Sequence, residues 1–139
     1  MPTDLSFVDT NVFAYRASDQ DARKKEIATD LLKSITTALS TQVLQEFYSV
    51  ATHPKKLAFS HAEAVELLEP LLAFAIHTVD VPAIQRALKL KERYQTSYWD
   101  AAIIVSAQSL GCRTIYSEDL SDGQNYDGVR VVNPFASSS

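Results

Sequence analysis

The 139-residue sequence predicts an α/β fold, with a central, mostly parallel, five-stranded sheet flanked by helices on both faces. Three observations predict it. Short apolar runs of strand length alternate with segments of helical periodicity along the whole chain. The composition, 46% hydrophobic and 22% charged, is that of one ordinary globular domain. No internal repeat or long linker divides the chain, so we expect a single domain over residues 1–135 and a disordered tail at residues 136–139.

The expected strands are short and apolar, as in a sheet that is buried on both faces. The first leads directly into Asp9, and the last is closed by Asn133-Pro134. Two pairs that favour turns, Asp122-Gly123 and Asp127-Gly128, separate the last two strands. The five ranges are residues 5–8, 37–39, 75–79, 113–116 and 129–132.

Helical segments fill the intervals between the strands and begin with recognisable signals. The expected starts are Asn11, Ser40 or Thr41, Ser60 (in a capping box with Glu63), Pro82 and Ser97. The first helix is interrupted around residues 17–21. Pro70 must kink or break a later helix, and Gly111 stands where the end of the last helix favours a left-handed residue.

Composition and charge exclude several classes of protein. A net charge of −4 and a pI near 5.3 argue against binding nucleic acid by bulk positive charge, although not against binding it through a metal ion. Three glycines leave no room for a phosphate-binding Walker loop. The single cysteine, Cys112, rules out an internal disulfide and fits a reducing cytosol. With no apolar run of about 18 residues and no visible secretory signal, we expect a cytoplasmic protein without membrane contact.

Four acidic residues occupy unusual positions in this pattern. Asp9 follows the first strand and Asp119 lies just past the fourth, at the edge where open α/β sheets bind ligands. Asp100 lies on a helix that is apolar nearly all round, and Glu46 interrupts the apolar face of another. Each alone can be explained as a cap, a turn residue or a solvated acid, and Asp100 also has capping-box spacing from Ser97.

Convergence of the four acids would have a clear chemical consequence. Each carboxylate would raise the pKa of the others by like-charge repulsion. No Lys or Arg stands beside any of them in the sequence to neutralise the group. Mg²⁺ and Mn²⁺ prefer oxygen ligands, so these acids are a candidate site for a hard divalent cation. Such a site can polarise a phosphoryl oxygen and generate hydroxide from bound water.

The segments that carry these acids resemble the four acidic motifs of the PIN-domain ribonucleases, and most closely the toxins of bacterial VapBC toxin–antitoxin pairs. The segments are residues 7–12, 45–48, 98–103 and 117–120, and the ending at residues 128–135 is also similar. The likeness covers essentially the whole chain. It implies a PIN-like nuclease domain with Mg²⁺ or Mn²⁺ as cofactor and an endoribonuclease activity on RNA. It also implies a VapB-like antitoxin as partner, and a homodimer.

The resemblance assigns roles residue by residue. The implied catalytic residues are Asp9, Glu46, Asp100 and Asp119. The implied metal ligands are Asp9, Asp100 and Asp119, while Glu46 orients a bound water. The implied supporting residues are Thr10, Asn11 and Ser117, with Asn11 bracing the loop rather than performing chemistry.

Two other classes of protein agree less well with the sequence, and one further interpretation stays open. A receiver domain needs adjacent acids early in the chain and a late lysine, but Asp9 has no acidic neighbour and no Lys follows Lys91. A phosphatase with an Asp-x-Asp motif fails because Thr10-Asn11 follow Asp9. A non-catalytic interaction module with the PIN fold remains the alternative.

Two sets of residues have a structural and a functional interpretation. For Tyr98 and Trp99, which precede Asp100, we expect packing in the core rather than stacking on bases. For Lys55-Lys56 we expect a solvated face, with contact to an RNA backbone as the alternative.

Overall fold

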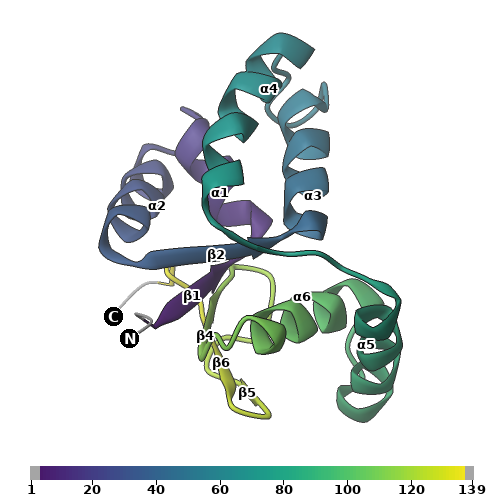
Figure 1. Ribbon diagram of the computed structural model, residues 1–139. Coiled ribbons are helices and arrows are strands. Elements are labelled where there is room, and N and C mark those ends of the chain that lie inside the picture. Colours follow the sequence, from purple (N-terminus) through teal and green to yellow (C-terminus); the bar gives the residue numbers. More distant parts are fainter. Residues whose placement is uncertain (1–3, 137–139) are drawn as a thin grey trace.

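The computed structural model describes residues 4–136 (Figure 1). Of the tail expected at residues 136–139, residues 137–139 lie outside the described residues. The Met1–Thr3 end, on which the expected absence of a secretory signal depends, also lies outside them. Six α-helices, one 3-10 helix and six strands make up the described chain. In chain order they are β1 (Leu5–Val8), α1 (Thr10–Ala17), α2 (Ala22–Ser34), β2 (Thr36–Ser40), α3 (Thr41–Thr52), α4 (His61–Leu68), η1 (Glu69–Ala73), β3 (Ala75–His77), α5 (Val81–Tyr94), α6 (Tyr98–Ser109), β4 (Thr114–Tyr116), β5 (Asn125–Tyr126) and β6 (Val129–Val132).

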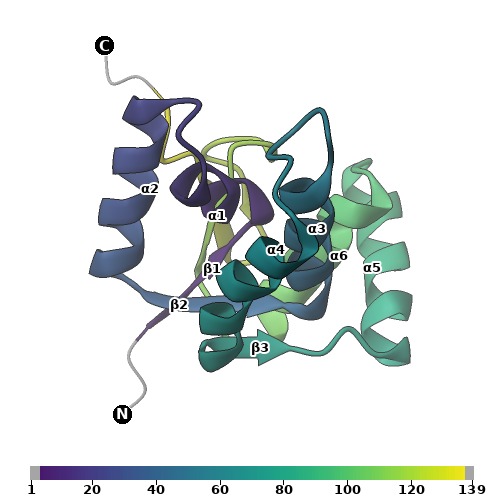
Figure 2. The same ribbon diagram turned by 90° about the horizontal axis from the view of Figure 1, so that it is seen from above.

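The predicted α/β architecture is confirmed. The strands form one sheet in the order β3-β2-β1-β4-β6-β5, and every neighbouring pair is parallel except β5 with β6. Helices α1–α4 lie on one side of the sheet and α5 and α6 on the other (Figure 1). Seen from above, α2 and α5 stand at opposite ends of the molecule (Figure 2).

The expected number of five strands is wrong by one. The additional strand, β5, has two residues and forms a hairpin with β6 through the Asp127-Gly128 turn, where both residues have positive φ angles of 52° and 99°. Asn125 Oδ1 accepts a hydrogen bond of 2.7 Å from Gly128 N and stabilises this turn. The sequence indicates the turn, but a strand of two residues is too short to show an alternating pattern.

The path of the chain determines where a ligand site can form. From β1 the chain moves outward through β2 to β3, and it then crosses to β4 on the other side of β1. The strand order therefore reverses between β1 and β4, and in open α/β sheets the crevice at such a reversal binds ligands. The residues that follow these two strands, Asp9 and Ser117, lie at that crevice.

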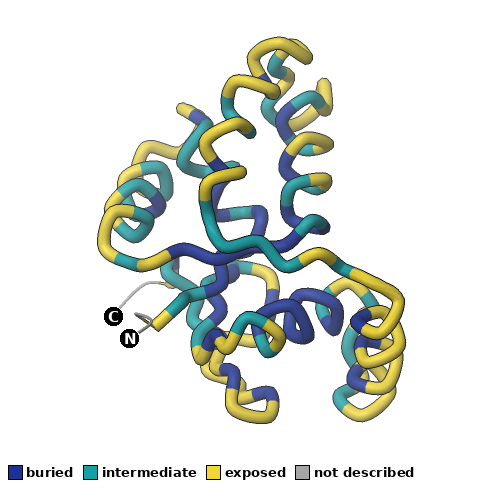
Figure 3. The backbone as a smooth tube through the Cα atoms, viewed as in Figure 1, coloured by how far each residue is buried: buried dark blue, intermediate teal, exposed yellow. Residues whose placement is uncertain are grey.

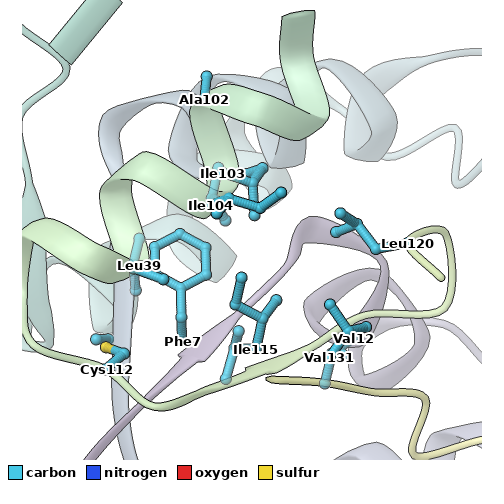
Figure 4. Close-up of a cluster of buried hydrophobic side chains, with 14 of the residues drawn as sticks. Phe7, Val12, Leu39, Ala102, Ile103, Ile104, Cys112, Ile115, Leu120 and Val131 are labelled. Carbon is cyan, nitrogen blue, oxygen red and sulfur yellow. The ribbon is translucent and has the colours of Figure 1, made fainter. Parts of the chain in front are cut away.

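Helix α6 is the central helix of the core, as its apolar sequence indicates. Every residue from Ala101 to Ala107 is buried, and most of α6 has the dark blue of buried residues in Figure 3. Figure 4 shows Ile104 of α6 above Phe7 of β1 and Ile115 of β4. This packing fixes the position of the first turn of α6, which carries Asp100. None of the helices within residues 4–136 has the length and hydropathy needed to cross a bilayer.

Most expected helix boundaries are confirmed, with one correction. Asp9, not Asn11, is the N-cap of α1, and its side chain accepts a hydrogen bond from Thr10 N. The expected capping box of Ser60 and Glu63 is present at α4, and a 3-10 helix containing Pro70 follows α4. The other caps and ends that agree with expectation are Ser40 at α3, Ser97 at α6 and Gly111 after α6, with φ 74°.

Candidate active site

One cavity of about 560 Å³ is lined by side chains from both halves of the sheet. All four acids singled out in the sequence line it, namely Asp9, Glu46, Asp100 and Asp119. They come from four different parts of the chain: the end of β1, the middle of α3, the first turn of α6 and the loop after β4. The fold therefore brings together residues that are far apart in sequence.

Asp9 is the most buried of the four acids, with 7% of its surface exposed. Its Oδ1 accepts a hydrogen bond of 2.8 Å from Thr10 N, and its Oδ2 accepts one of 2.8 Å from Ser117 Oγ. The pKa of Asp9 is raised to about 6, mainly by burial and to a smaller extent by the charges of Glu46 and Asp119, against the lowering effect of the two hydrogen bonds. The folded protein therefore holds an acid whose charged form is disfavoured.

Glu46 and Asp100 are half-buried and also have raised pKa values. Burial raises the pKa of Glu46, and the charges of Asp100 and Asp119 act in the same direction. Burial likewise raises the pKa of Asp100, with a contribution from Asp119. Thr10 Oγ1 donates to Glu46 Oε1 at 3.1 Å. The acids thus influence one another through space, as expected of charges that share a cavity.

The loop that carries Asp119 is held by Asn11 and Ser117. Asn11 Nδ2 donates to Asp119 Oδ2 at 3.2 Å, while Asn11 Oδ1 accepts from Glu118 N at 3.2 Å. Ser117 Oγ accepts from Asp119 N at 3.1 Å and from Leu120 N at 3.3 Å, in addition to donating to Asp9. The hydrogen bonds of these two residues join α1 and the end of β1 to the loop after β4.

Glu118 also lines the cavity, but it has its own cation. Tyr15 OH donates to Glu118 Oε1 at 2.6 Å, and Lys24 forms an ion pair with Oε2. Burial acts to raise the pKa of Glu118, but the hydrogen bonds from Lys24 and Tyr15 outweigh it. The pKa of Glu118 therefore lies below its ordinary value. Within residues 4–136 the other ion pairs are Lys25–Asp19 and Arg93–Asp127, so none includes the four candidate acids.

Gln42 is a site residue that the sequence reasoning missed. Its side chain is buried, and its amide donates to Glu46 Oε1 at 3.5 Å and to the carbonyl of Trp99 at 3.3 Å. It therefore links the second acid to the start of the helix that carries Asp100. The only sequence signal is its position one helical turn before Glu46.

The expectation of core packing for Trp99 is wrong, because 62% of its surface is exposed. Its ring lies on the first turn of α6 and lines the cavity. Lys55 and Lys56, in the turn after α3, line the same cavity and are exposed. The cavity therefore combines an acidic interior with exposed cations and one exposed aromatic ring.

The chemistry of the donors suits a hard divalent cation. All four candidate residues offer carboxylate oxygens. For Asp9, Glu46 and Asp100, burial and the neighbouring negative charges disfavour the charged form. In residues 4–136, however, no three His, Cys, Asp or Glu side chains already stand in metal-binding proximity. The acids line the cavity without forming a compact cluster, so binding an ion requires their side chains to draw together.

Comparison with known proteins adds a family and a set of similar folds. The family model of the PIN domain matches residues 6–121. A search of curated proteins finds no match. Among solved structures, VapC20 of Mycobacterium tuberculosis, a toxin that cleaves the sarcin–ricin loop, is 22% identical with a TM-score of 0.69, over 82% of this chain and 89% of that chain.

Two further structures have a similar fold. A toxin–antitoxin complex from Klebsiella pneumoniae is 19% identical with a TM-score of 0.68, over 94% of this chain and 98% of that chain. FitAcB from Neisseria gonorrhoeae is 22% identical with a TM-score of 0.66, over 93% of this chain and 97% of that chain. At these identities the likeness establishes the fold.

Proposed function

This chain belongs to the PIN-domain family, and we propose that it is a metal-dependent endoribonuclease, the toxin of a bacterial toxin–antitoxin pair. One observation carries the proposal above all: four acids from distant segments line one cavity, and none has an ion-pair partner among residues 4–136. The similarity in fold to a toxin that cleaves the sarcin–ricin loop of RNA supports the same conclusion.

We propose that Asp9, Asp100 and Asp119 hold Mg²⁺ or Mn²⁺. Such an ion, when bound, stabilises charge on a phosphoryl oxygen and lowers the pKa of water. The chain itself supplies the ligands and their orientation. The hydrogen bonds from Ser117 and Thr10 N fix the carboxylate of Asp9, and Asn11 fixes that of Asp119.

In the proposed reaction Glu46 orients the attacking water and accepts its proton. Burial and the nearby charges of Asp100 and Asp119 raise the pKa of Glu46, which makes its carboxylate a better proton acceptor. The hydrogen bonds from Thr10 and Gln42 to Oε1 hold this carboxylate in place. A bond forms between the water oxygen and phosphorus as the bond to the leaving ribose oxygen breaks on the opposite side, and the released oxygen takes a proton from solvent water.

The direct test is cleavage of RNA by the purified chain with Mg²⁺ or Mn²⁺. We expect cleavage that EDTA stops and that an Asp9→Asn chain does not show. Calorimetry should also detect uptake of Mn²⁺ by the parent chain. Absence of both cleavage and metal uptake would contradict the proposal and favour a non-catalytic interaction module.

We further propose that the chain pairs with a small VapB-like antitoxin and forms a homodimer in the cytoplasm. The similar structure from Klebsiella pneumoniae is a toxin–antitoxin complex, which supports such a partner. A basic side chain of the antitoxin placed among the four acids would neutralise them and block the cavity. The free thiol of Cys112 is consistent with a reducing compartment.

Gln42→Leu should lower kcat about tenfold, with little change in KM, because residues that orient a catalytic group typically contribute about 10- to 100-fold. The variant keeps the volume of the side chain but removes the donor to Glu46 Oε1 and to the carbonyl of Trp99. Steady-state kinetics on a short RNA would measure kcat and KM separately. Gln108→Leu is the matched control, since Gln108 donates to Tyr126 O and does not line the cavity. An unchanged kcat for Gln42→Leu would show that Gln42 does not position Glu46 for catalysis.

The double change Lys55→Ala with Lys56→Ala should weaken RNA binding and reduce its dependence on salt. Two lost phosphate contacts on a single strand reduce the slope of log K against log salt by about 1.4. Binding titrations between about 50 and 200 mM salt would measure it. Lys89→Ala with Lys91→Ala, a pair of exposed residues on α5 outside the cavity, is the control and should keep the parent slope. Equal slopes for the two double variants would mean that Lys55 and Lys56 are only solvated.

A further inference from the structure

Trp99 is the single tryptophan of the chain, yet it is not part of the core. Its ring is 62% exposed, while large rings such as Phe7, Phe13 and Phe47 are almost fully buried. Tyr98 packs edge-on against it, with ring centroids 5.0 Å apart and an angle of 79° between the planes. An exposed ring that is supported from one side and lines the acidic cavity can receive another flat group.

The two exposed lysines in the cavity lining stand on a well-supported turn. Lys56 N donates to His53 O at 2.9 Å, and Lys56 O accepts from Gln20 Nε2 at 3.0 Å. Leu57 N donates to Val50 O at 3.4 Å, which ties the turn to the end of α3. These hydrogen bonds fix the backbone of the two lysines relative to α3, while the charged ends of their side chains extend into solvent.

Helix α3 gives the spacing between the ring and the cations. Gln42, Glu46 and Val50 line the cavity at intervals of four residues, so they form one wall. Gln42 contacts the carbonyl of Trp99, and Val50 contacts the lysine turn. Eight residues of α-helix span about 12 Å, so the backbone of Trp99 and the backbone of the lysine turn are separated by roughly this length, with Glu46 on the wall between them.

We infer that Trp99 stacks on an unpaired base of the RNA substrate. This inference rests on the proposed function. A strand that lies along α3 places phosphates beside Lys55 and Lys56, the bond to be cut beside Glu46, and a base on Trp99. An aromatic ring binds any base through its flat face, but only where that base is not already stacked within a duplex.

A nucleic acid fits this surface better than a protein segment does. The cations and the ring occupy opposite ends of one wall, which matches a chain that carries anionic groups and flat groups in a regular order. The overall charge of −4 makes positive charge scarce, so two adjacent lysines at the cavity are the positive part of its lining. Phosphates are the groups that would use them.

Kinetics on single-stranded RNA provide the first test. Truncation of a stacking ring to alanine typically lowers affinity for the base about 5- to 150-fold, so Trp99→Ala should raise KM by a factor in that range. Trp99→Phe should keep most of the affinity. Leu88→Ala is the matched control, since Leu88 is a similarly exposed apolar residue on α5 that does not line the cavity. Equal KM values for the parent and Trp99→Ala would overturn the inference but leave the proposed function intact.

The fluorescence of the single tryptophan provides a second test that does not depend on cleavage. We expect a single-stranded RNA, added in EDTA, to quench this fluorescence and to protect the ring from acrylamide, and the same sequence as a duplex to do neither. Binding of the single strand without any change in fluorescence would overturn the inference, as would equal quenching by the duplex. If a purified antitoxin quenches the ring and RNA does not, the ring belongs to a protein interface and the inference is also overturned. Absence of both cleavage and RNA binding would contradict the proposed function as well.

Discussion

Asp100→Asn is expected to reduce the rate of RNA cleavage about a thousandfold or more, because a metal ion contributes several kcal/mol to the stability of a phosphoryl-transfer transition state. The substitution removes a negative charge from the candidate metal site, yet an asparagine at position 100 still offers its backbone N–H to Ser97 Oγ. The helix should therefore keep its start, and only the charge is changed. Cleavage rates under single-turnover conditions at equal Mg²⁺ concentration would measure the effect.

The control for this experiment is another aspartate close in sequence to the site. Asp122 does not line the cavity, and its Oδ1 accepts a hydrogen bond of 2.9 Å from Asn133 N, which an asparagine oxygen can also accept. Asp122→Asn should therefore cleave RNA at nearly the parent rate. If Asp100→Asn cleaved as fast as the parent chain, the assignment of Asp100 as a metal ligand would be wrong.

Asp9→Asn is expected to stabilise the metal-free protein at neutral pH by about 2 to 3 kcal/mol, while it abolishes cleavage. The pKa of Asp9 rises from 3.8 to about 6 in the folded state, mainly because the carboxyl group is buried. The folded state thus binds this proton more tightly than the unfolded state does. The stability that the protonated carboxyl contributes is fully present below about pH 4 and is lost as the pH rises through about 6.

The pH dependence distinguishes this effect from a general improvement in packing. An asparagine resembles the protonated acid at every pH, and it can still accept the hydrogen bond from Thr10 N. The difference in unfolding free energy between Asp9→Asn and the parent should therefore be small near pH 4 and grow to a plateau above about pH 6. Urea denaturation in EDTA across this range would measure it. Asp30→Asn, an exposed change on α2, should show no such trend. A constant difference across the range would contradict the explanation by burial.

The sequence predicts the parts of the site that depend on local order along the chain. Asp9 and Asp119 could be placed because each follows a strand, and parallel strands end at one edge of the sheet. Asp100 could be singled out because an acid stands at the start of a helix that is apolar nearly all round. In the structure these three acids and Glu46 line one cavity.

The sequence could not predict the contacts that join distant segments. The Tyr15–Glu118 hydrogen bond spans 103 positions and the Lys24–Glu118 pair spans 94, and no local pattern indicates either. Trp99 was expected in the core, but the structure leaves most of its surface exposed. Whether a ring on the first turn of a helix points inward depends on how that helix meets the sheet edge, which is a tertiary property.

The hydrogen bond from Ser117 to Asp9 has a consequence for how the protein is made. It joins the beginning of the chain to a segment 108 positions later, and Asp119 follows only two residues after Ser117. As long as residues 117–119 have not emerged from the ribosome, the emerged portion lacks both the partner of Asp9 and the fourth acid. The cavity is complete only after the segment through Asp119 has left the exit tunnel. The proposed nuclease is therefore expected to cleave no RNA before that segment has emerged.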